Sequence, residues 1–339
     1  MVFKDITHSS FNNITASDHV EFNHEKVFYY EDQSVGLISI VAIHDTSSGP
    51  AIGGCRFKSY NSYEDGLSDV LRLSRGMTHK NVVANIPFGG GKAIIFADGP
   101  KTHELLQSFG NFLNLIDGEY ISAEDIGITL EDIQFINKFS DHVFDNVDPG
   151  PYTARGIFYS IQAIIQYVHG SDLTNKNISI QGAGSVGSRL AKHLADEGST
   201  VFIHDFDEQK TKSLVSDSIH LVANPLSQPC EIFAPCAVGG ILSEQSISHL
   251  GAKIIAGGAN NQLLHPHIDS LLFQAGITYI PDVLINSGGV IGLTKDLLKR
   301  DDAQINLDLE AIASRVINLM DESKQSSKSI LDIMNRSMF

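Results

Sequence analysis

The sequence predicts an α/β protein of two domains, a mixed α/β domain followed by a doubly wound parallel sheet. A chain of 339 residues with 42% hydrophobic content can form two cores of medium size. Short apolar runs alternate with helical ones after about residue 150, which is typical of a parallel sheet. Residues 145–156 are dense in Pro, Gly and Asp and mark a boundary. We therefore expect domains at 1–150 and 151–321, with a C-terminal helix at about 322–339 that packs back on the first domain.

The expected elements of the first domain follow from hydrophobic periodicity. Ser62 and Asp65 have the spacing of a helix capping box, and the apolar face that follows predicts a helix that ends shortly before Lys80. The remaining expected elements are a strand at 35–44, a strand at 92–98, a helix at 103–116, a short strand ending near Asp125 and a capped helix at 129–139.

Two lysines enclose a glycine-rich apolar segment, "KNVVANIPFGGGKAII". A phosphate-binding loop would need glycine at Ile86 and Ser or Thr at Ala93, so that reading fails. Two alternatives remain open on the residues alone. Lys80 and Lys92 are ordinary surface charges, or the glycines let the backbone closely approach a bound group. If the strands at Lys92 and Asp125 run antiparallel in one sheet, both side chains emerge at the same edge.

The second domain is expected to begin with a helix at 154–168. Expected strands follow in "NISIQ", "STVFIHD", "CEIFAPCA", "AKIIAGGAN" and "ITYIPD", with helical segments between them and two helices after about residue 308.

A dinucleotide-binding signature lies between the first of these strands and a helix. Gly182, Gly184 and Gly187 form GxGxxG, and Asp205 ends the next strand at the offset of a ribose-binding acid. The glycines permit a tight turn, close backbone approach to a pyrophosphate and close helix packing, while the helix N-terminus offers N–H groups to the anion. A carboxylate at position 205 would repel a 2′-phosphate and favours NAD over NADP. The alternative is a simple turn in an α/β domain.

Composition excludes several classes of partner. A formal net charge of −16 without a Lys/Arg-rich block argues against nucleic acid or an anionic membrane. Three cysteines without a CxxC pair suggest neither a disulfide framework nor a metal site. The N-terminal residues lack the apolar core of a signal peptide. These observations predict a cytoplasmic protein without a metal.

Eight segments resemble the Glu/Leu/Phe/Val amino acid dehydrogenase family, most of all its leucine, valine and phenylalanine branch. They are "GPAIGGCRF", "LRLSRGMTHKN", "NIPFGGGKAII", "YISAEDIG", "QGAGSVG", "IFAPCAVGGIL", "IIAGGANNQL" and "YIPDVLINSGGVI". The match extends in order from about residue 35 to about residue 320. It implies a substrate domain, a Rossmann NAD-binding domain and an active site in the cleft between them.

The resemblance gives the two lysines separate tasks. It assigns Lys80 to the substrate carboxylate, Lys92 to general acid/base catalysis and Asp125 to the carboxylate partner in proton transfer. An L-amino acid needs a fixed cation for its carboxylate, and its ammonium must lose a proton before the α-hydrogen leaves as hydride. Lys92 suits the second task if desolvation and the nearby cation bring its pKa toward neutrality. The glycines would then let the backbone approach the substrate.

Further positions follow from the same resemblance. Thr153 matches a nicotinamide-contacting threonine, and Asn260 and Asn261 match residues that divide contacts between the nicotinamide ribose and the substrate. The implied sets also include Gly53 and Gly54 for substrate, and Ser185, Val186, Cys236 and Ala237 for cofactor.

The implied pocket positions are Ile52, Ala123, Val290 and Leu293, all aliphatic, which disfavours glutamate. Phenylalanine enzymes typically have glycine at the position of Ala123, so alanine favours leucine, valine or isoleucine. One methyl group discriminates by only about 1–3 kcal/mol, so phenylalanine or tryptophan remains an alternative. A non-catalytic NAD-binding regulator would not need Lys80, Lys92 and Asp125. The resemblance also implies a homo-oligomer, a dimer or an octamer.

Overall fold

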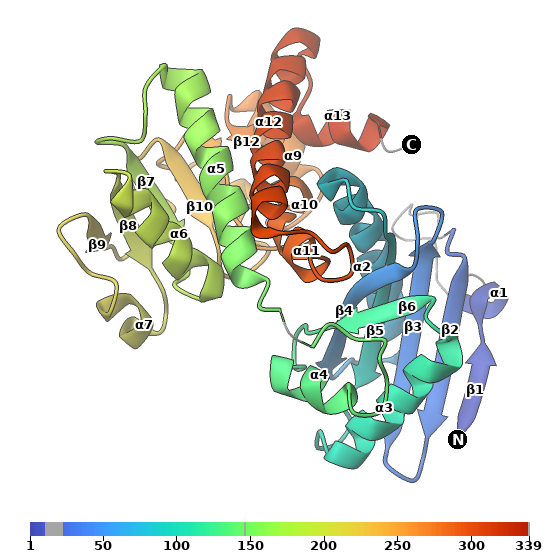
Figure 1. Cartoon of the computed structure of the whole chain (residues 1–339). Helices are drawn as coiled ribbons and strands as arrows, with labels where there is room; N and C mark the ends of the chain where they lie inside the picture. The colour runs from blue at the N-terminus through green and yellow to red at the C-terminus, as the bar shows by residue number, and fades with distance from the viewer. Residues whose placement is uncertain (11–22, 146, 338–339) are drawn as a thin grey trace. The chain divides into compact units, whose positions relative to one another are not determined.

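The computed structural model describes residues 1–10, 23–145 and 147–337, and the chain divides into two compact units, Met1–Asp148 and Pro149–Phe339 (Figure 1). This confirms the predicted α/β class, with a mixed α/β first domain and a parallel sheet in the second, and the first sheet has both parallel and antiparallel strands. The exact domain limits remain predictions, and Asn146 in the expected boundary segment lies outside the described residues.

A six-stranded mixed sheet forms the centre of the first unit. Its strands are β1 (Val2–Asp5), β2 (Lys26–Asp32), β3 (Leu37–Asp45), β4 (Ala51–Lys58), β5 (Gly89–Phe96) and β6 (Tyr120–Ala123), in the order β1-β2-β3-β5-β4-β6. β1, β2, β3 and β5 pair antiparallel, whereas β4 pairs parallel with both β5 and β6. The strands at 2–5, 26–32 and 51–58 were not expected from the sequence.

Helices cover both faces of this sheet. α2 (Tyr63–Ala84) packs on one face with Ile40 and Ala42 of β3, while α3 (His103–Ile116) and α4 (Leu130–Ile136) pack on the other with Val41 and Ile43. The alternation follows from the two-residue period of side chains along a strand. A short helix, α1 (Thr7–Ser10), precedes β2.

α2 begins as predicted but ends later. Ser62 is its N-cap and accepts a hydrogen bond from the Asp65 N–H. The helix continues past Lys80 to Ala84, where Asn85 adopts the left-handed conformation and its N–H caps the last turn. The expected end before Lys80 is therefore wrong, and Lys80 lies inside the helix.

β5 also differs from its prediction. It begins at Gly89 and includes the glycines, so Lys92 lies within the strand. The condition that Lys92 and Asp125 belong to antiparallel strands is not met, because β4 lies between β5 and β6 and pairs parallel with each.

The second unit contains an all-parallel six-stranded sheet. Its strands are β7 (Asn177–Gln181), β8 (Thr200–His204), β9 (Ile219–Leu221), β10 (Ile232–Pro235), β11 (Ile254–Ile255) and β12 (Thr278–Tyr279). Their order, β12-β11-β10-β7-β8-β9, is the doubly wound order of dinucleotide-binding folds, with β7 as the first strand.

Nine helices are described in the second unit. They are α5 (Gly150–His169), α6 (Ser185–Asp196), α7 (Glu208–Lys212), α8 (Glu244–Ile247), α9 (Ile268–Gln274), α10 (Asp282–Ile285), α11 (Gly288–Leu293), α12 (Asp302–Ser326) and α13 (Ile330–Ser337). α13 contacts α12, and its expected packing on the first domain remains a prediction. Within the described part of the chain, none of the helices has the length and apolar character needed to cross a membrane.

Candidate active site

Lys92 and Asp125 meet across Gly54. Gly54 in β4 pairs with Ala123, the last residue of β6, and the parallel register of β4 and β5 sets Gly54 level with Lys92. Asp125 follows β6 by two residues. Because Gly54 has no side chain, the Nζ of Lys92 reaches the Oδ2 of Asp125 at 2.7 Å. The neighbours of Gly54 leave little room, since a Cβ there would lie 3.1 Å from that Nζ.

The environment keeps Asp125 ionised. Burial by itself raises the pKa of its carboxyl, but the positive charges of Lys92 and Arg56 outweigh burial, and the net pKa lies below the ordinary value. Lys92 is only 7% exposed. A lysine and a carboxylate are thus held in contact and largely buried, an arrangement suited to moving a proton.

The three glycines of β5 are required by the protein's own packing. A Cβ at Gly89 would lie 2.0 Å from the backbone oxygen of Asp45, and one at Gly90 would lie 2.1 Å from the backbone nitrogen of Thr78 in α2. A Cβ at Gly91 would lie 2.6 Å from the Tyr120 ring. Close packing of β5 against these neighbours is therefore sufficient reason for the glycines, and the expected approach of the backbone to a substrate remains a prediction.

Lys80 lies on the part of α2 that packs on this glycine segment. Its neighbour Asn81 is fully buried and donates from its side-chain amide to the backbone oxygen of Gly89 at 2.7 Å. This hydrogen bond fixes the end of α2 to the start of β5 and so sets the backbone position of Lys80. Sequence reasoning missed Asn81, although its place beside Lys80 in "THKN" was a signal.

The predicted substrate residues lie in both units. In the first unit, Gly53 and Gly54 each accept a hydrogen bond from the Tyr120 hydroxyl, at 2.8 and 3.0 Å, and Ile52 and Ala123 are buried close by on β4 and β6. In the second unit, Val290 is buried and Leu293 is half-buried on α11.

The loop between β7 and α6 has the geometry of a dinucleotide site. Gly182 has a φ of 100°, and a Cβ there would lie 2.8 Å from the Cβ of Ala237 and 2.9 Å from the backbone oxygen of Cys236. A Cβ at Gly187 would lie 2.0 Å from the oxygen of Gly182, so α6 packs tightly on the turn. A Cβ at Gly184 would meet nothing within 4 Å.

These residues fit a bound nicotinamide dinucleotide. Space is open at Gly184, the N-cap of α6, where Ser185 and Val186 form the first turn and present backbone N–H groups. The open space suits a pyrophosphate, whereas the crowded Gly182 and Gly187 shape the loop around it.

Asp205 is held at the end of β8. Its Oδ2 accepts from the Ala183 N–H at 2.7 Å and its Oδ1 from the Asp207 N–H at 2.9 Å. Burial by itself raises the pKa of Asp205. The two hydrogen bonds and the charge of Lys210 together lower it by more, so the net pKa lies below the ordinary value. The carboxylate is therefore charged near neutral pH, and its bond to Ala183 ties it to the loop between β7 and α6.

A second group of predicted cofactor residues gathers around Gly258. A Cβ there would lie 3.1 Å from Val186 and 3.8 Å from Thr153. The side-chain amide of Asn286 donates to the backbone oxygen of Gly258 at 3.2 Å and to the Oδ1 of Asn260 at 2.7 Å. The second unit thus brings Thr153, Val186 and Asn260 together, and Asn286, which sequence reasoning missed, orients Asn260.

Asn261 has a backbone conformation of its own. Its φ is 53°, in the left-handed region, and its N–H donates to the Oδ2 of Asp282 at 2.7 Å. Asp282 at the start of α10 therefore stabilises the turn that presents Asn260 and Asn261.

Comparisons with known proteins identify the family of this chain. The family model for the Glu/Leu/Phe/Val dehydrogenase dimerisation domain matches residues 24–142, and the Glutamate/Leucine/Phenylalanine/Valine dehydrogenase model matches 150–207 and 203–334. The chain is 39% identical over 289 residues to leucine dehydrogenase of Geobacillus stearothermophilus, covering 81% of this chain and 79% of that protein. It is 34% identical over 337 residues to phenylalanine dehydrogenase of Caldalkalibacillus thermarum, covering 92% and 90%.

A solved structure supports the same assignment. The crystal structure of L-tryptophan dehydrogenase from Nostoc punctiforme aligns with a TM-score of 0.82 and 35% identity, covering 93% of this chain and 94% of that one. The fold, the Lys92–Asp125 pair of the first unit and the dinucleotide-binding loop of the second unit define a nicotinamide-dependent oxidoreductase. The chain belongs to the Glu/Leu/Phe/Val dehydrogenase family and is an amino acid dehydrogenase, acting on CH–NH2 donors with NAD or NADP.

Proposed function

We propose that this protein oxidatively deaminates a branched-chain aliphatic L-amino acid to its 2-oxo acid and ammonia, with NAD⁺ as acceptor, and catalyses the reverse reductive amination. The observation that carries the proposal is the buried Lys92–Asp125 pair, 2.7 Å apart across Gly54. An acid/base pair in contact and largely buried is suited to removing a proton from an ammonium group.

Lys80 binds the substrate carboxylate in this proposal, and Lys92 handles the protons of the reacting centre. The substrate ammonium gives a proton to the neutral amine of Lys92, and Asp125 stabilises the ammonium that forms. The α-hydrogen then leaves with its electron pair as hydride, which the nicotinamide ring accepts when NAD⁺ is bound. Lys92 must release this proton to solvent before it acts as a base again, and it then removes a proton from the water that adds to the iminium carbon and passes it to the amino nitrogen. Ammonia leaves as the hydroxyl of this adduct gives up its proton, which forms the carbonyl of the 2-oxo acid.

The cofactor contacts are assigned to the second unit. The loop at Gly182, Gly184 and Gly187, together with Ser185, receives the pyrophosphate, and the charged Asp205 accepts from the adenosine ribose hydroxyls. The lowered pKa of Asp205 supports NAD over NADP, because a carboxylate repels a 2′-phosphate. Thr153, Val186 and Asn260 are assigned to the nicotinamide end, with Cys236 and Ala237 beside the loop.

Substrate choice is assigned to four aliphatic positions, Ile52, Ala123, Val290 and Leu293, with Asn261 as a polar contact. Relatives at similar identity include leucine, phenylalanine and tryptophan dehydrogenases, so the identity values do not decide between substrates. The methyl group of Ala123 supports a branched aliphatic side chain, since glycine there would leave room for a ring.

A panel of L-amino acids tests this proposal, with NAD⁺ or NADP⁺ and the absorbance of the reduced nicotinamide as readout. We expect kcat/KM with NAD⁺ to be highest for leucine, valine or isoleucine. Ala123→Gly should shift the ratio of phenylalanine to leucine upward by about tenfold, corresponding to one methyl group. A wild-type preference for phenylalanine or tryptophan would replace the substrate assignment, and inactivity on every amino acid would overturn the whole proposal.

We further propose that the protein is a cytoplasmic homo-oligomer, a dimer or an octamer. The match of residues 24–142 to a dimerisation domain supports self-association. Light scattering after size-exclusion chromatography should give a mass of two or eight chains of 36.9 kDa, and a monomer would contradict this.

A further inference from the structure

Asp125 has a second cation besides Lys92. The Nε of Arg56 lies 3.2 Å from the Oδ2 of Asp125, the same oxygen that Lys92 contacts. Arg56 is on β4, two residues after Gly54, and its side chain is 12% exposed. Its other branch reaches α2, where Nη1 lies 2.9 Å from the Oδ2 of Asp69. One guanidinium therefore links two carboxylates from different elements.

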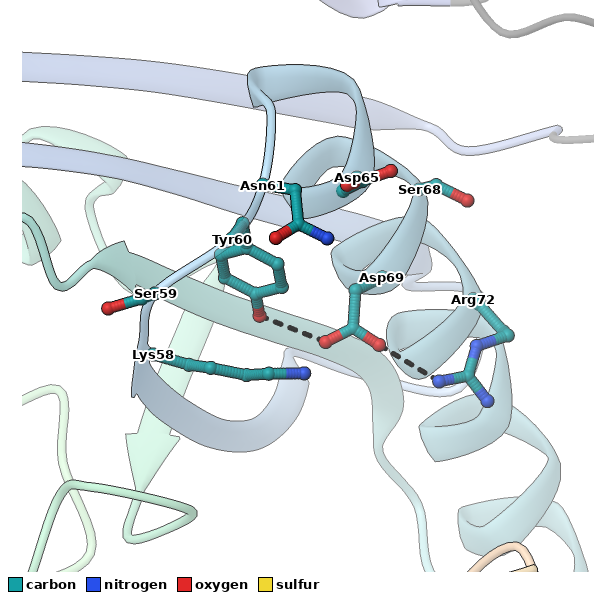
Figure 2. A pocket seen from close by; sticks show the side chains of 8 residues that line it. All are labelled: Lys58, Ser59, Tyr60, Asn61, Asp65, Ser68, Asp69 and Arg72. Carbon is teal, nitrogen blue, oxygen red and sulfur yellow. Dashed lines mark hydrogen bonds and ion pairs between the residues drawn. The ribbon is translucent and has the colours of Figure 1, made fainter.

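The Asp69 end of this link is itself fixed. Asp69 accepts from the Tyr60 hydroxyl and from Arg72, each at 2.9 Å, as Figure 2 shows. These groups form one wall of a polar surface hollow of about 540 Å³, yet the Asp69 side chain is only 12% exposed. Arg56 is thus anchored on α2 by a carboxylate with three donors, which leaves its Nε pointed at Asp125.

The backbone around Asp125 does not depend on the Arg56 side chain. The Phe57 N–H donates to the Ile126 oxygen at 2.8 Å, and the Ile128 N–H donates to the Asp125 oxygen at 3.0 Å. A Cβ at Gly127 would lie 2.2 Å from the Phe57 oxygen, so this turn packs directly on β4. None of these backbone contacts is made by the guanidinium, whose removal takes one cation from Asp125 and one from Asp69.

An arginine supplies something at this position that a lysine does not. In the proposed reaction Lys92 alternates between charged and neutral forms, so its attraction for Asp125 varies during turnover. A guanidinium remains protonated in proteins. We propose that Arg56 is a positioning residue that holds the Asp125 carboxylate ionised and aimed at Lys92 while Lys92 gains and loses its proton. This inference rests on the proposed function.

The other titratable groups around Asp125 do not replace this cation. Burial raises the pKa of the Cys55 thiol on β4, of the Tyr60 phenol and of the Tyr120 phenol on β6, so all three are neutral near pH 7. Burial, followed by the charges of Asp148 and Asp125, raises the pKa of Glu124. Among the described residues, Lys92 and Arg56 are the two cations in ion-pair contact with Asp125.

The test compares Arg56→Gln and Arg56→Lys with the wild-type protein, with Arg336→Gln as control. Arg336 forms an exposed ion pair with Asp332 on α13, far from Arg56 in sequence. The readouts are kcat and KM for the amino acid across pH, the NAD⁺ dissociation constant and the melting temperature. For Arg56→Gln we expect kcat to fall roughly tenfold or more, KM and NAD⁺ binding to change less than about twofold, and the acid limb of kcat/KM to move up by about one pH unit. In Arg56→Lys the acid limb should shift by no more than half as much as in Arg56→Gln, because lysine keeps the positive charge but lacks the planar guanidinium.

An acid limb that stays in place in Arg56→Gln overturns the inference, even if kcat and melting temperature both fall, because that pattern indicates a merely structural role. Should the wild-type protein oxidise no amino acid, the proposed function fails, and the inference is then decided without activity. The Asp125 carboxyl is titrated by NMR in protein with ¹³C-labelled aspartate, its signal assigned by its loss in Asp125→Asn. A midpoint that rises by about one pH unit in Arg56→Gln supports the inference, and an unchanged midpoint overturns it.

Discussion

Gly54→Ala tests whether the absence of one side chain creates the proposed acid/base pair. The added Cβ would lie 2.6 Å from the backbone oxygen of Glu124, 2.9 Å from the Cβ of Asp125 and 3.1 Å from the Nζ of Lys92. Ordinary contact begins at 3.4 Å, so the backbone at Glu124 must recede by about 0.8 Å. That movement carries Asp125 away from Lys92.

The size of the expected effect follows from this displacement. A misplacement of about 1 Å at a catalytic group costs about 100-fold in rate, and overpacking of this kind destabilises a protein by about 1–3 kcal/mol. We expect kcat to fall about 100-fold while NAD⁺ binding, which is assigned to the second unit, is retained.

Gly76→Ala is the matched control, because it is also a Gly-to-Ala change in the first unit but would meet nothing within 4 Å. It lies inside α2, where alanine should stabilise by about 0.5–1 kcal/mol. Steady-state kinetics and urea unfolding measure both variants. A Gly54→Ala enzyme with wild-type kcat would refute the account of how the Lys92–Asp125 contact is built.

Two further predictions concern charge. Asp205→Asn should lower the ratio of kcat/KM with NAD⁺ to that with NADP⁺ by at least about tenfold, because the charge that repels a 2′-phosphate is gone. The control Glu208→Gln changes an exposed carboxylate nearby in the sequence and should leave the ratio unchanged. An unaltered ratio in Asp205→Asn would contradict the proposed reason for NAD preference. Burial, followed by the charge of His44, lowers the pKa of His24 to about 3 from 6.5. The unfolded chain therefore binds a proton below about pH 6.5 that the folded chain refuses, and the free energy of unfolding should fall as pH decreases by up to about 1.4 kcal/mol per pH unit from this group. His24→Gln should remove that slope between about pH 6 and 4, whereas replacement of the exposed His169 should not; equal slopes in urea titrations would contradict the assignment.

Local signals in the sequence predicted much of the fold. The amphipathic segment at 103–116 is the helix α3, and the segment "NISIQ" is the strand β7. The GxGxxG loop and Asp205 were recognisable because fixed residue types at fixed spacing are needed for the turn, the helix packing and the carboxylate. These features depend on neighbours within about twenty residues.

Features that depend on distant packing were not predicted. The end of α2 was placed too early because residues 75–80 are half-buried and, apart from Gly76 and Met77, polar, so the apolar periodicity stops before the helix does. The glycines of β5 were left outside the strand expected at 92–98, because glycine is a poor strand former. They form a strand because they pair with β3 and β4, and they are glycine because Asp45, Thr78 and Tyr120 leave no room for side chains.

The candidate site shows the same division. Lys92 and Asp125 were identified through family motifs, but the antiparallel arrangement expected for them was wrong, because nothing local to either segment places β4 between β5 and β6. Arg56 and Asp69 gave no signal at all, since their contacts join residues of β4, α2 and the turn after β6 only once the sheet has formed.

The central claim is that Lys92, held against Asp125, handles the protons of an L-amino acid that this protein oxidises with NAD⁺. The direct measurement is the initial rate of NADH formation with L-leucine for wild-type protein and Lys92→Ala, with the NAD⁺ dissociation constant of both determined by calorimetry. The account predicts a wild-type rate that Lys92→Ala loses by at least about 1,000-fold, with NAD⁺ affinity unchanged within about twofold. A Lys92→Ala enzyme that still turns over L-leucine at a rate near that of the wild type would contradict it.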